Sequence, residues 1–177
     1  MQRWRVPLGF VCLALFLLFA QPRPWTLAIG ALVALPGLAL RAWATGHLRK
    51  NEALATTGPY AHTRNPLYLG SLLMGIGFTI AAGRWFLIII FAVMLLGIYL
   101  PVMRVESATL AELFGEKYQH YARQVPLILP RLSPYRSPDH PEVSFDSALY
   151  RRYREHRAAL GLLVAWSLLA LKAFLFK

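Results

Sequence analysis

Five blocks of apolar residues, each nearly free of charge, divide this chain. They are Val6–Ala20, Trp25–Leu40, Leu67–Ala82, Trp85–Met103 and Ala158–Phe176. A helix that crosses a membrane needs about 20 apolar residues, within a range of about 17–25. The last two blocks meet that length, whereas the first two are short. Because backbone inside lipid must satisfy its own hydrogen bonds, complete spans are favoured over partial ones. The pattern predicts an all-α, polytopic membrane helix bundle with about five transmembrane helices.

Composition and charge agree with a membrane location. Of the 177 residues, 57% are hydrophobic, and the mean hydropathy is +0.46. The net charge of +11 would suggest nucleic acid as a partner of a soluble protein. Here the positive-inside rule explains it, because a cytoplasmic N-terminus places most of the 19 basic residues on the cytoplasmic side. The exceptions are Arg23, Arg84, Lys172 and Lys177. We expect a multi-pass protein of the prokaryotic inner membrane, with no nucleic-acid partner.

The polar parts of the chain lie mostly on the expected cytoplasmic side. They are residues 42–65, 104–130 and 131–157, whereas the opposite connections, residues 21–24 and 83–84, are short. Any active site is therefore expected at the cytoplasmic face of a single integral membrane domain, residues 1–177. The lone Cys12 excludes an intrachain disulfide, and His47 and His62 do not have a convincing metal-ligand spacing, so no metal is expected.

The first polar segment ends in a motif-rich stretch, Gly58–Gly70, at the start of the third apolar block. Thr-Thr-Gly-Pro before it is typical of a turn. Pro66 is expected near the first turn of the following helix, where a missing N–H is harmless. A helix N-terminus presents free N–H donors and a partial positive charge, and Arg64 would add a forked cation. This arrangement suits a carboxylate or phosphate, although a basic span entry with interfacial tyrosines would look similar.

The second polar segment, residues 104–121, predicts an amphipathic cytoplasmic helix that lies along the membrane surface and is interrupted near Gly115. Glu106 lies about one turn past the apolar run, where acidic groups are rare unless paired. Arg104 does not face it, because residues two apart point away from each other on a helix. We expect Arg64 or the ammonium group of a bound ligand as its partner, with an exposed interfacial glutamate as the alternative.

These residues resemble a known family. The sequences Gly-His-Leu-Arg-Lys-Asn-Glu (46–52), Gly-Pro-Tyr-x-x-x-Arg-Asn-Pro-x-Tyr-x-Gly (58–70) and Glu-Ser-x-x-Leu-x-x-x-Phe-Gly-x-x-Tyr-x-x-Tyr (106–121), followed by Val-Pro, are similar to the isoprenylcysteine carboxyl methyltransferase family. That group of integral membrane enzymes also includes phospholipid methyltransferase-like members. The resemblance covers a core of residues 41–131. It leaves residues 132–157 as a cytoplasmic basic linker and 158–177 as an extra C-terminal transmembrane helix.

The resemblance implies methyl transfer from S-adenosylmethionine to a lipid or prenylated acceptor, a phospholipid amine or an isoprenylcysteine-type carboxylate. The catalytic candidates that it implies are Arg64, Glu106 and His47. Arg64 or His47 would hold the methionyl carboxylate, Glu106 would hold the ammonium or a ribose hydroxyl, and tyrosine faces would pack on adenine or the sulfonium. The implied cofactor-binding residues are His47, Gly58, Pro59, Tyr60, Arg64, Asn65, Pro66, Tyr68, Leu69, Gly70, Glu106, Tyr118 and Tyr121.

Two departures from the family pattern concern acid–base chemistry. The family often has Arg-His-Pro where this chain has Arg64-Asn65-Pro66, and a paired Glu-Glu where it has Glu106-Ser107. Asparagine can donate a hydrogen bond but cannot titrate. A carboxylate acceptor needs no proton removed, whereas an amine must be neutral. His47, His62 and Glu106 are the candidate bases, and lipid amine, isoprenoid carboxylate and small thiol all remain open as acceptors.

Two other functions are compatible with the pattern. Membrane sterol-type reductases that use NADPH have a similar architecture, although their chains are longer. A non-enzymatic basic membrane scaffold is the second alternative. In either case the basic run Arg151–Arg157 would act as a stop signal before the last span or attract anionic head groups of membrane lipids.

Overall fold

The structure, a computed structural model, describes residues 14–49, 52–137 and 143–175. Every regular element in this part of the chain is helical, so the expected all-α fold is confirmed. Residues 14–19 are helical and precede the labelled elements. The elements are α2 (Pro24–Thr45), η2 (Gly58–Ala61), α3 (Pro66–Ala82), α4 (Phe86–Met94), η3 (Leu95–Tyr99), α5 (Leu100–Gln124), α6 (Ser147–Arg152) and α7 (His156–Leu175).

Three helical segments are long and apolar enough to cross a membrane. They are Pro24–Thr45, Phe86–Gln124 and His156–Leu175, and the apolar helix α3 is shorter, at 17 residues. The expected first span, Val6–Ala20, lies mostly outside the described residues. The polytopic helical bundle is therefore confirmed, whereas the count of five spans stays a prediction.

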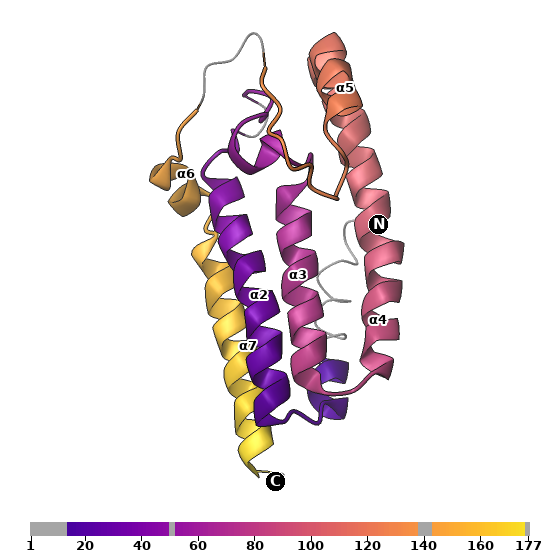
Figure 1. The fold of residues 1–177 in the computed structure, drawn as a ribbon, viewed down its shortest axis with the longest axis vertical. Helices are drawn as coiled ribbons and strands as arrows, with labels where there is room; N and C mark the ends of the chain where they lie inside the picture. Colours follow the sequence, from indigo (N-terminus) through magenta and orange to yellow (C-terminus); the bar gives the residue numbers. More distant parts are fainter. Residues whose placement is uncertain (1–13, 50–51, 138–142, 176–177) are drawn as a thin grey trace.

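The helices stand side by side, and their connections differ strongly between the two ends of the bundle (Figure 1). One end carries residues 46–49, 52–65, 125–137 and 143–146 together with α6, and we call it the motif end. The other carries residues 20–24 and 83–85, and we call it the short-loop end. There the backbone N–H of Gln21 donates to the carbonyl of Ala82 at 2.8 Å. The short connections leave little polar mass at that end.

Helices α2 and α3 approach closely because glycines face each other at two levels. A Cβ added to Gly77 would lie 2.5 Å from the carbonyl oxygen of Gly30, and one added to Gly37 would lie 2.6 Å from that of Gly70. In each helix the two glycines are seven residues apart, so they lie on one face. In lipid, where no hydrophobic force drives helices together, such close backbone contact supplies the packing energy.

This contact makes a stability prediction. Gly77→Ala is expected to lower the free energy of unfolding by about 1–3 kcal/mol, because the new methyl group has no room against Gly30. Gly161→Ala in α7 is the matched control, since nothing lies within 4 Å of its added Cβ. For Gly161→Ala we expect the free energy of unfolding to rise by about 0.5–1 kcal/mol, because alanine has a higher helix propensity than glycine. Denaturant unfolding in detergent micelles compares the two, and equal effects would contradict the close packing.

Helix α4, η3 and the first part of α5 follow one another as one helix that extends past the end of α3 (Figure 1). The amphipathic segment therefore continues this helix as far as Gly115, and its placement along the membrane surface stays a prediction. The expected interruption at Gly115 is confirmed, since its φ of 51° and ψ of −128° are non-helical. Beyond it, Tyr118, Tyr121 and Val125 join a buried cluster with Ala61 and Tyr135.

The last helix is attached to the bundle by an ion pair inside the structure. Arg41 of α2 donates from Nε to Oε1 of Glu155 at 2.6 Å and from Nη2 to Oε2 at 3.0 Å. Its Nη1 reaches Ser71 Oγ at 2.5 Å and the carbonyl of Leu67 at 3.3 Å, both in α3. One guanidinium therefore joins α2, α3 and the start of α7. In the sequence, Glu155 stood out only as one acid within a basic run.

Candidate functional site

The first motif residues form a tight turn over His47. Gly58 has a φ of +58°, in the left-handed region, and a Cβ there would lie 2.7 Å from His47 Nε2. The imidazole Nδ1 is 3.3 Å from Thr57 Oγ1. Burial lowers the pKa of His47 below its ordinary value, so the ring is neutral near pH 7. Glycine is needed here because any side chain would displace the imidazole.

This burial predicts a pH dependence of stability. Because the pKa of His47 is lower in the folded than in the unfolded state, the unfolded state binds more protons as pH falls below about 6.5. Stability therefore decreases with falling pH in that window. We expect His47→Gln to remove this part of the slope, measured by denaturant unfolding at several pH values. Identical slopes in the two proteins would show that His47 does not cause the effect.

Arg64, in the first motif segment, contacts residues in and just after the second motif segment. Its backbone N–H donates to the carbonyl of Pro126 at 2.9 Å, and its Nη1 donates to the hydroxyl of Tyr118 at 3.3 Å. Its Nε is buried and has no hydrogen-bond partner within the described part of the chain. A buried donor left unsatisfied costs about 1–3 kcal/mol. The guanidinium is therefore held in place and keeps a donor for an added acceptor.

Asn65 connects the start of α3 to the segment that follows α5. Its side-chain amide donates to the carbonyl of Leu127 at 3.1 Å, which also accepts from Thr63 Oγ1 at 3.3 Å. Nearby, His62 Nδ1 lies 2.8 Å from the carbonyl of Arg131. Because a carbonyl only accepts, the Nδ1 of His62 is the donor in this contact. Asn65 thus acts as a hydrogen-bond donor to the backbone, without need of a titratable group.

Tyr68 and Glu106 bring the two motif segments together. The Tyr68 hydroxyl donates to Glu106 Oε2 at 3.0 Å, on an exposed part of the motif end. The Tyr68 ring also packs edge-on against Tyr99, with 5.8 Å between centroids. The expectation that Arg64 pairs with Glu106 is wrong in this structure, because Arg64 bonds to Tyr118 instead. Arg64, just before α3, and Tyr68, in its first turn, are nonetheless both bonded to side chains of α5.

The remaining tyrosines form a buried support beneath these residues. Tyr121 donates its hydroxyl to the backbone carbonyl of Tyr60 at 2.7 Å. Burial is the main cause that raises the pKa of Tyr60, so its phenol stays protonated. The Tyr118 and Tyr121 rings lie 6.4 Å apart, and both residues are buried. These rings stabilise the loop that carries Arg64, and little of their aromatic surface is exposed for a ligand to stack on.

The other expected site residues serve the backbone arrangement. Pro59 and Pro66 are fully buried, and Pro66 is the first residue of α3, as the sequence predicted. Leu69 is half-buried. Gly70 packs against α2, where a Cβ would lie 2.5 Å from Arg41 Cγ. Sequence reasoning missed Arg41 and Glu155 because their pairing spans 114 positions of the chain.

A cavity of about 50 Å³ lies at the motif end beside His47, Thr57 and Val143. Pockets for small molecules usually measure about 300–1,000 Å³. Entry of a ligand of that size requires the segments around this cavity to separate. His47 and Thr57, which line this cavity, are joined by their contact of 3.3 Å, whereas Glu106 is exposed.

Together these features define an all-helical integral membrane protein with a polar site at one end of its bundle. The phospholipid methyltransferase family model matches residues 28–117, half of the chain, and the chain belongs to that family. This match includes the first motif segment and most of the second, with Tyr68 and Glu106. Membership supports a membrane methyltransferase and agrees with the resemblance found in the sequence motifs.

Three curated relatives extend this comparison. The cobalt-zinc-cadmium resistance protein CzcN of Cupriavidus metallidurans is 34% identical over 142 residues, covering 75% of this chain and 64% of that protein. The nickel-cobalt-cadmium resistance protein NccN of Alcaligenes xylosoxydans xylosoxydans is 33% identical over 141 residues, covering 76% of this chain and 66% of that protein. The protein-S-isoprenylcysteine O-methyltransferase of Schizosaccharomyces pombe is 30% identical over 81 residues, covering 46% of this chain and 34% of that protein. The chain thus spans about two thirds of the first two relatives, and no solved structure matches it.

Proposed function

We propose that this chain transfers a methyl group from S-adenosylmethionine to a lipid or prenylated acceptor at the motif end of the bundle. The observation that carries the proposal is the meeting of two motif segments, through Tyr68 with Glu106 and Arg64 with Tyr118. Membership in the phospholipid methyltransferase family supports the reaction class. Similarity to an isoprenylcysteine O-methyltransferase supports a hydrophobic acceptor.

The residues at this end fit an amino-acid-bearing cofactor. The unpartnered Nε of Arg64 and the N-terminal N–H groups of α3 would hold a carboxylate. The exposed carboxylate of Glu106, oriented by Tyr68, would hold an ammonium group or a ribose hydroxyl. When bound, the cofactor supplies a methyl group already activated by a sulfonium. The chain must then position the acceptor about 3–3.5 Å away and exclude water.

The nature of the acceptor decides whether the chain also needs a base. A carboxylate reacts as it stands, whereas an amine must first lose a proton. His62 is a candidate base, because its Nδ1 is bonded to the Arg131 carbonyl and leaves Nε2 as an acceptor. His47 is neutral and buried under Gly58, so it suits binding or support of the loop.

Methyl transfer is tested with the full chain in lipid nanodiscs, radiolabelled S-adenosylmethionine, and either total bacterial lipid extract or a farnesylated cysteine analogue. Label in a phosphatidylethanolamine-derived band would establish lipid N-methylation. Label in the cysteine analogue would establish carboxyl methylation. Arg136→Gln, an exposed change at the same end, should leave transfer unchanged. Absence of both transfer and cofactor binding in folded protein would refute the proposal.

Tolerance of divalent metal ions is a second candidate function, because two relatives are described as metal resistance proteins. We propose that any such effect depends on methyl transfer by this chain. A metal-sensitive bacterial host expressing the wild-type chain should then grow better in cobalt and cadmium salts, whereas Glu106→Gln should not help. Equal protection by both proteins would separate tolerance from the transfer reaction.

A further inference from the structure

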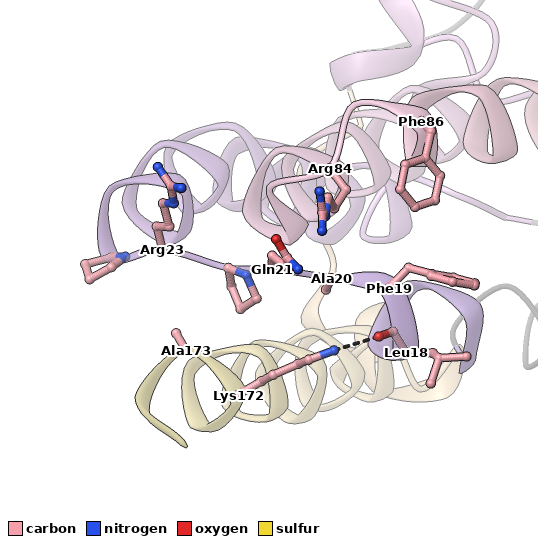
Figure 2. A pocket seen from close by; sticks show the side chains of 11 residues that line it. Leu18, Phe19, Ala20, Gln21, Arg23, Arg84, Phe86, Lys172 and Ala173 are labelled. Carbon is pink, nitrogen blue, oxygen red and sulfur yellow. Dashed lines mark hydrogen bonds between the residues drawn. The ribbon is translucent and has the colours of Figure 1, made fainter. Parts of the chain in front are cut away.

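A cavity of about 630 Å³ lies at the short-loop end, and its lining includes none of the motif residues (Figure 2). Three separate parts of the chain line it: residues 18–24 before and at the start of α2, Arg84 and Phe86 at the start of α4, and Lys172 and Ala173 near the end of α7. Its size falls within the range of about 300–1,000 Å³ typical of small-molecule sites. The methyl-transfer proposal makes no use of it.

Three cations line this cavity, Arg23, Arg84 and Lys172. No acidic residue is close to them in the sequence, and neither ion pair formed by the described residues involves them. The acidic residues that the structure describes are absent from its lining: Glu52, Glu106, Glu112, Glu116, Asp146 and Glu155. Among the described residues, therefore, no acidic side chain of the lining compensates the positive charge of the cavity. The positive-inside rule disfavours cations at an outer face, so their grouping here calls for an anionic partner.

One of the three cations, Lys172, is held by backbone carbonyls. The Lys172 ammonium donates to the carbonyls of Leu17 at 2.6 Å and Leu18 at 2.8 Å, at the C-terminal end of the 14–19 helix. This is where a cation is favourable, and the ammonium has a third donor to offer. Arg84 follows Gly83, whose φ of 68° closes the α3 turn. Figure 2 shows Arg84 and Lys172 on opposite sides of the Gln21 segment, with Arg23 at its edge.

The surroundings of the cavity suit the membrane–water boundary. Trp25 and Trp85 are exposed by 58% and 75%, next in sequence to Pro24 and Arg84. Exposed tryptophans at both ends of a span are typical of the interfacial belt. Leu18, Phe19 and Phe86 add apolar lining. A ligand here can therefore place an anionic group among the cations and an acyl chain against apolar side chains.

We propose that the short-loop end binds the head group of an anionic phospholipid. The Arg84 guanidinium presents a donor fork that matches a phosphodiester, and Lys172 and Arg23 add positive charge. Basic pockets between membrane helices commonly bind such head groups. A zwitterionic lipid has the same phosphate but brings a cation toward three others. The cavity should therefore select dioleoylphosphatidylglycerol over dioleoylphosphatidylcholine.

Native mass spectrometry of the full chain in detergent tests this selection. We expect saturable phosphatidylglycerol binding that a tenfold excess of phosphatidylcholine does not displace. Arg84→Gln should weaken it about tenfold, and Arg84→Lys by less. Arg136→Gln is the matched control, since it removes one exposed positive charge at the motif end. Circular dichroism would confirm that each variant keeps its helix content.

Two outcomes would overturn the proposal. Equal binding of the two lipids, or an equal loss in Arg84→Gln and Arg136→Gln, would mean that general charge attraction suffices. Displacement of phosphatidylglycerol by millimolar inorganic phosphate would assign the cavity to a free anion and exclude the lipid. Methyl transfer is measured separately, so failure here leaves the motif-end reaction untouched.

Discussion

Glu155→Ala is expected to lower the free energy of unfolding by about 3 kcal/mol. Removing one partner of a buried ion pair costs about 3–5 kcal/mol, because the remaining charge is left uncompensated. Arg41 keeps 22% of its side chain exposed and Glu155 keeps 9%, which places the effect at the lower end. Arg41 would still contact Ser71 and Leu67, so α2 and α3 stay joined while α7 is released. Denaturant unfolding in micelles measures the change.

The chain offers a matched control at its surface. Glu52 and Arg152 form an ion pair of 3.5 Å with side chains 58% and 63% exposed. Exposed pairs contribute about 0–1 kcal/mol, so Glu52→Ala should have little effect. Replacing both Arg41 and Glu155 with methionine should cost less than Glu155→Ala alone, because no charge is left unpaired. A double variant less stable than the single one would contradict this account.

Arg64→Ala is expected to weaken S-adenosylmethionine binding by about 10- to 100-fold. A hydrogen bond to a charged group contributes about 1.5–3 kcal/mol, and each 1.4 kcal/mol is tenfold in affinity. The buried Nε of Arg64 is the donor that we expect to meet the cofactor carboxylate. Equilibrium binding of radiolabelled cofactor in nanodiscs measures the loss. Glu106→Gln should weaken binding as well, with less effect on folding because Glu106 is exposed.

Two variants separate binding from support of the loop. Tyr118→Phe removes the hydroxyl that accepts from Arg64 at 3.3 Å, so it should weaken cofactor binding less than Arg64→Ala does. Arg104→Ala removes an exposed arginine of α5 and should leave affinity unchanged. Unchanged affinity in Arg64→Ala, with helix content preserved, would exclude Arg64 from the cofactor site.

The sequence predicted the features that depend on neighbouring residues. Apolar blocks predicted the helices, Pro66 predicted the start of α3, and Gly115 predicted the interruption of α5, because proline and glycine act through local backbone geometry. The motif at 58–70 also predicted a polar site at one end of the bundle, and the structure places these residues together at the motif end.

The partners of individual side chains were harder to predict. Arg64 was one of the partners expected for Glu106, beside a ligand's ammonium group, but the structure joins Glu106 to Tyr68 and Arg64 to Tyr118. Such contacts depend on how far each helix is rotated about its axis, which apolar patterning fixes only to within a broad face. Gly70 illustrates the same limit, since a motif glycine at a helix contact looks like one at a ligand site.

The π-helical turn at Leu95–Tyr99 affects the direction in which Glu106 points farther along the same helix. Pro101 lacks an N–H and its ring crowds the carbonyl of Gly97, so a wider turn is accommodated just before it. Each residue of an α-helix advances the chain by about 100°. Deleting Gly97 should convert the wider turn to an ordinary α-turn and leave Glu106 near Tyr68. Deleting Val102 from the α-helical part should instead turn Glu106 away by about a quarter of a circle. A residue gained or lost in the α-helical part between the π-helical turn and Glu106 therefore changes the direction in which the Glu106 carboxylate points from the helix axis.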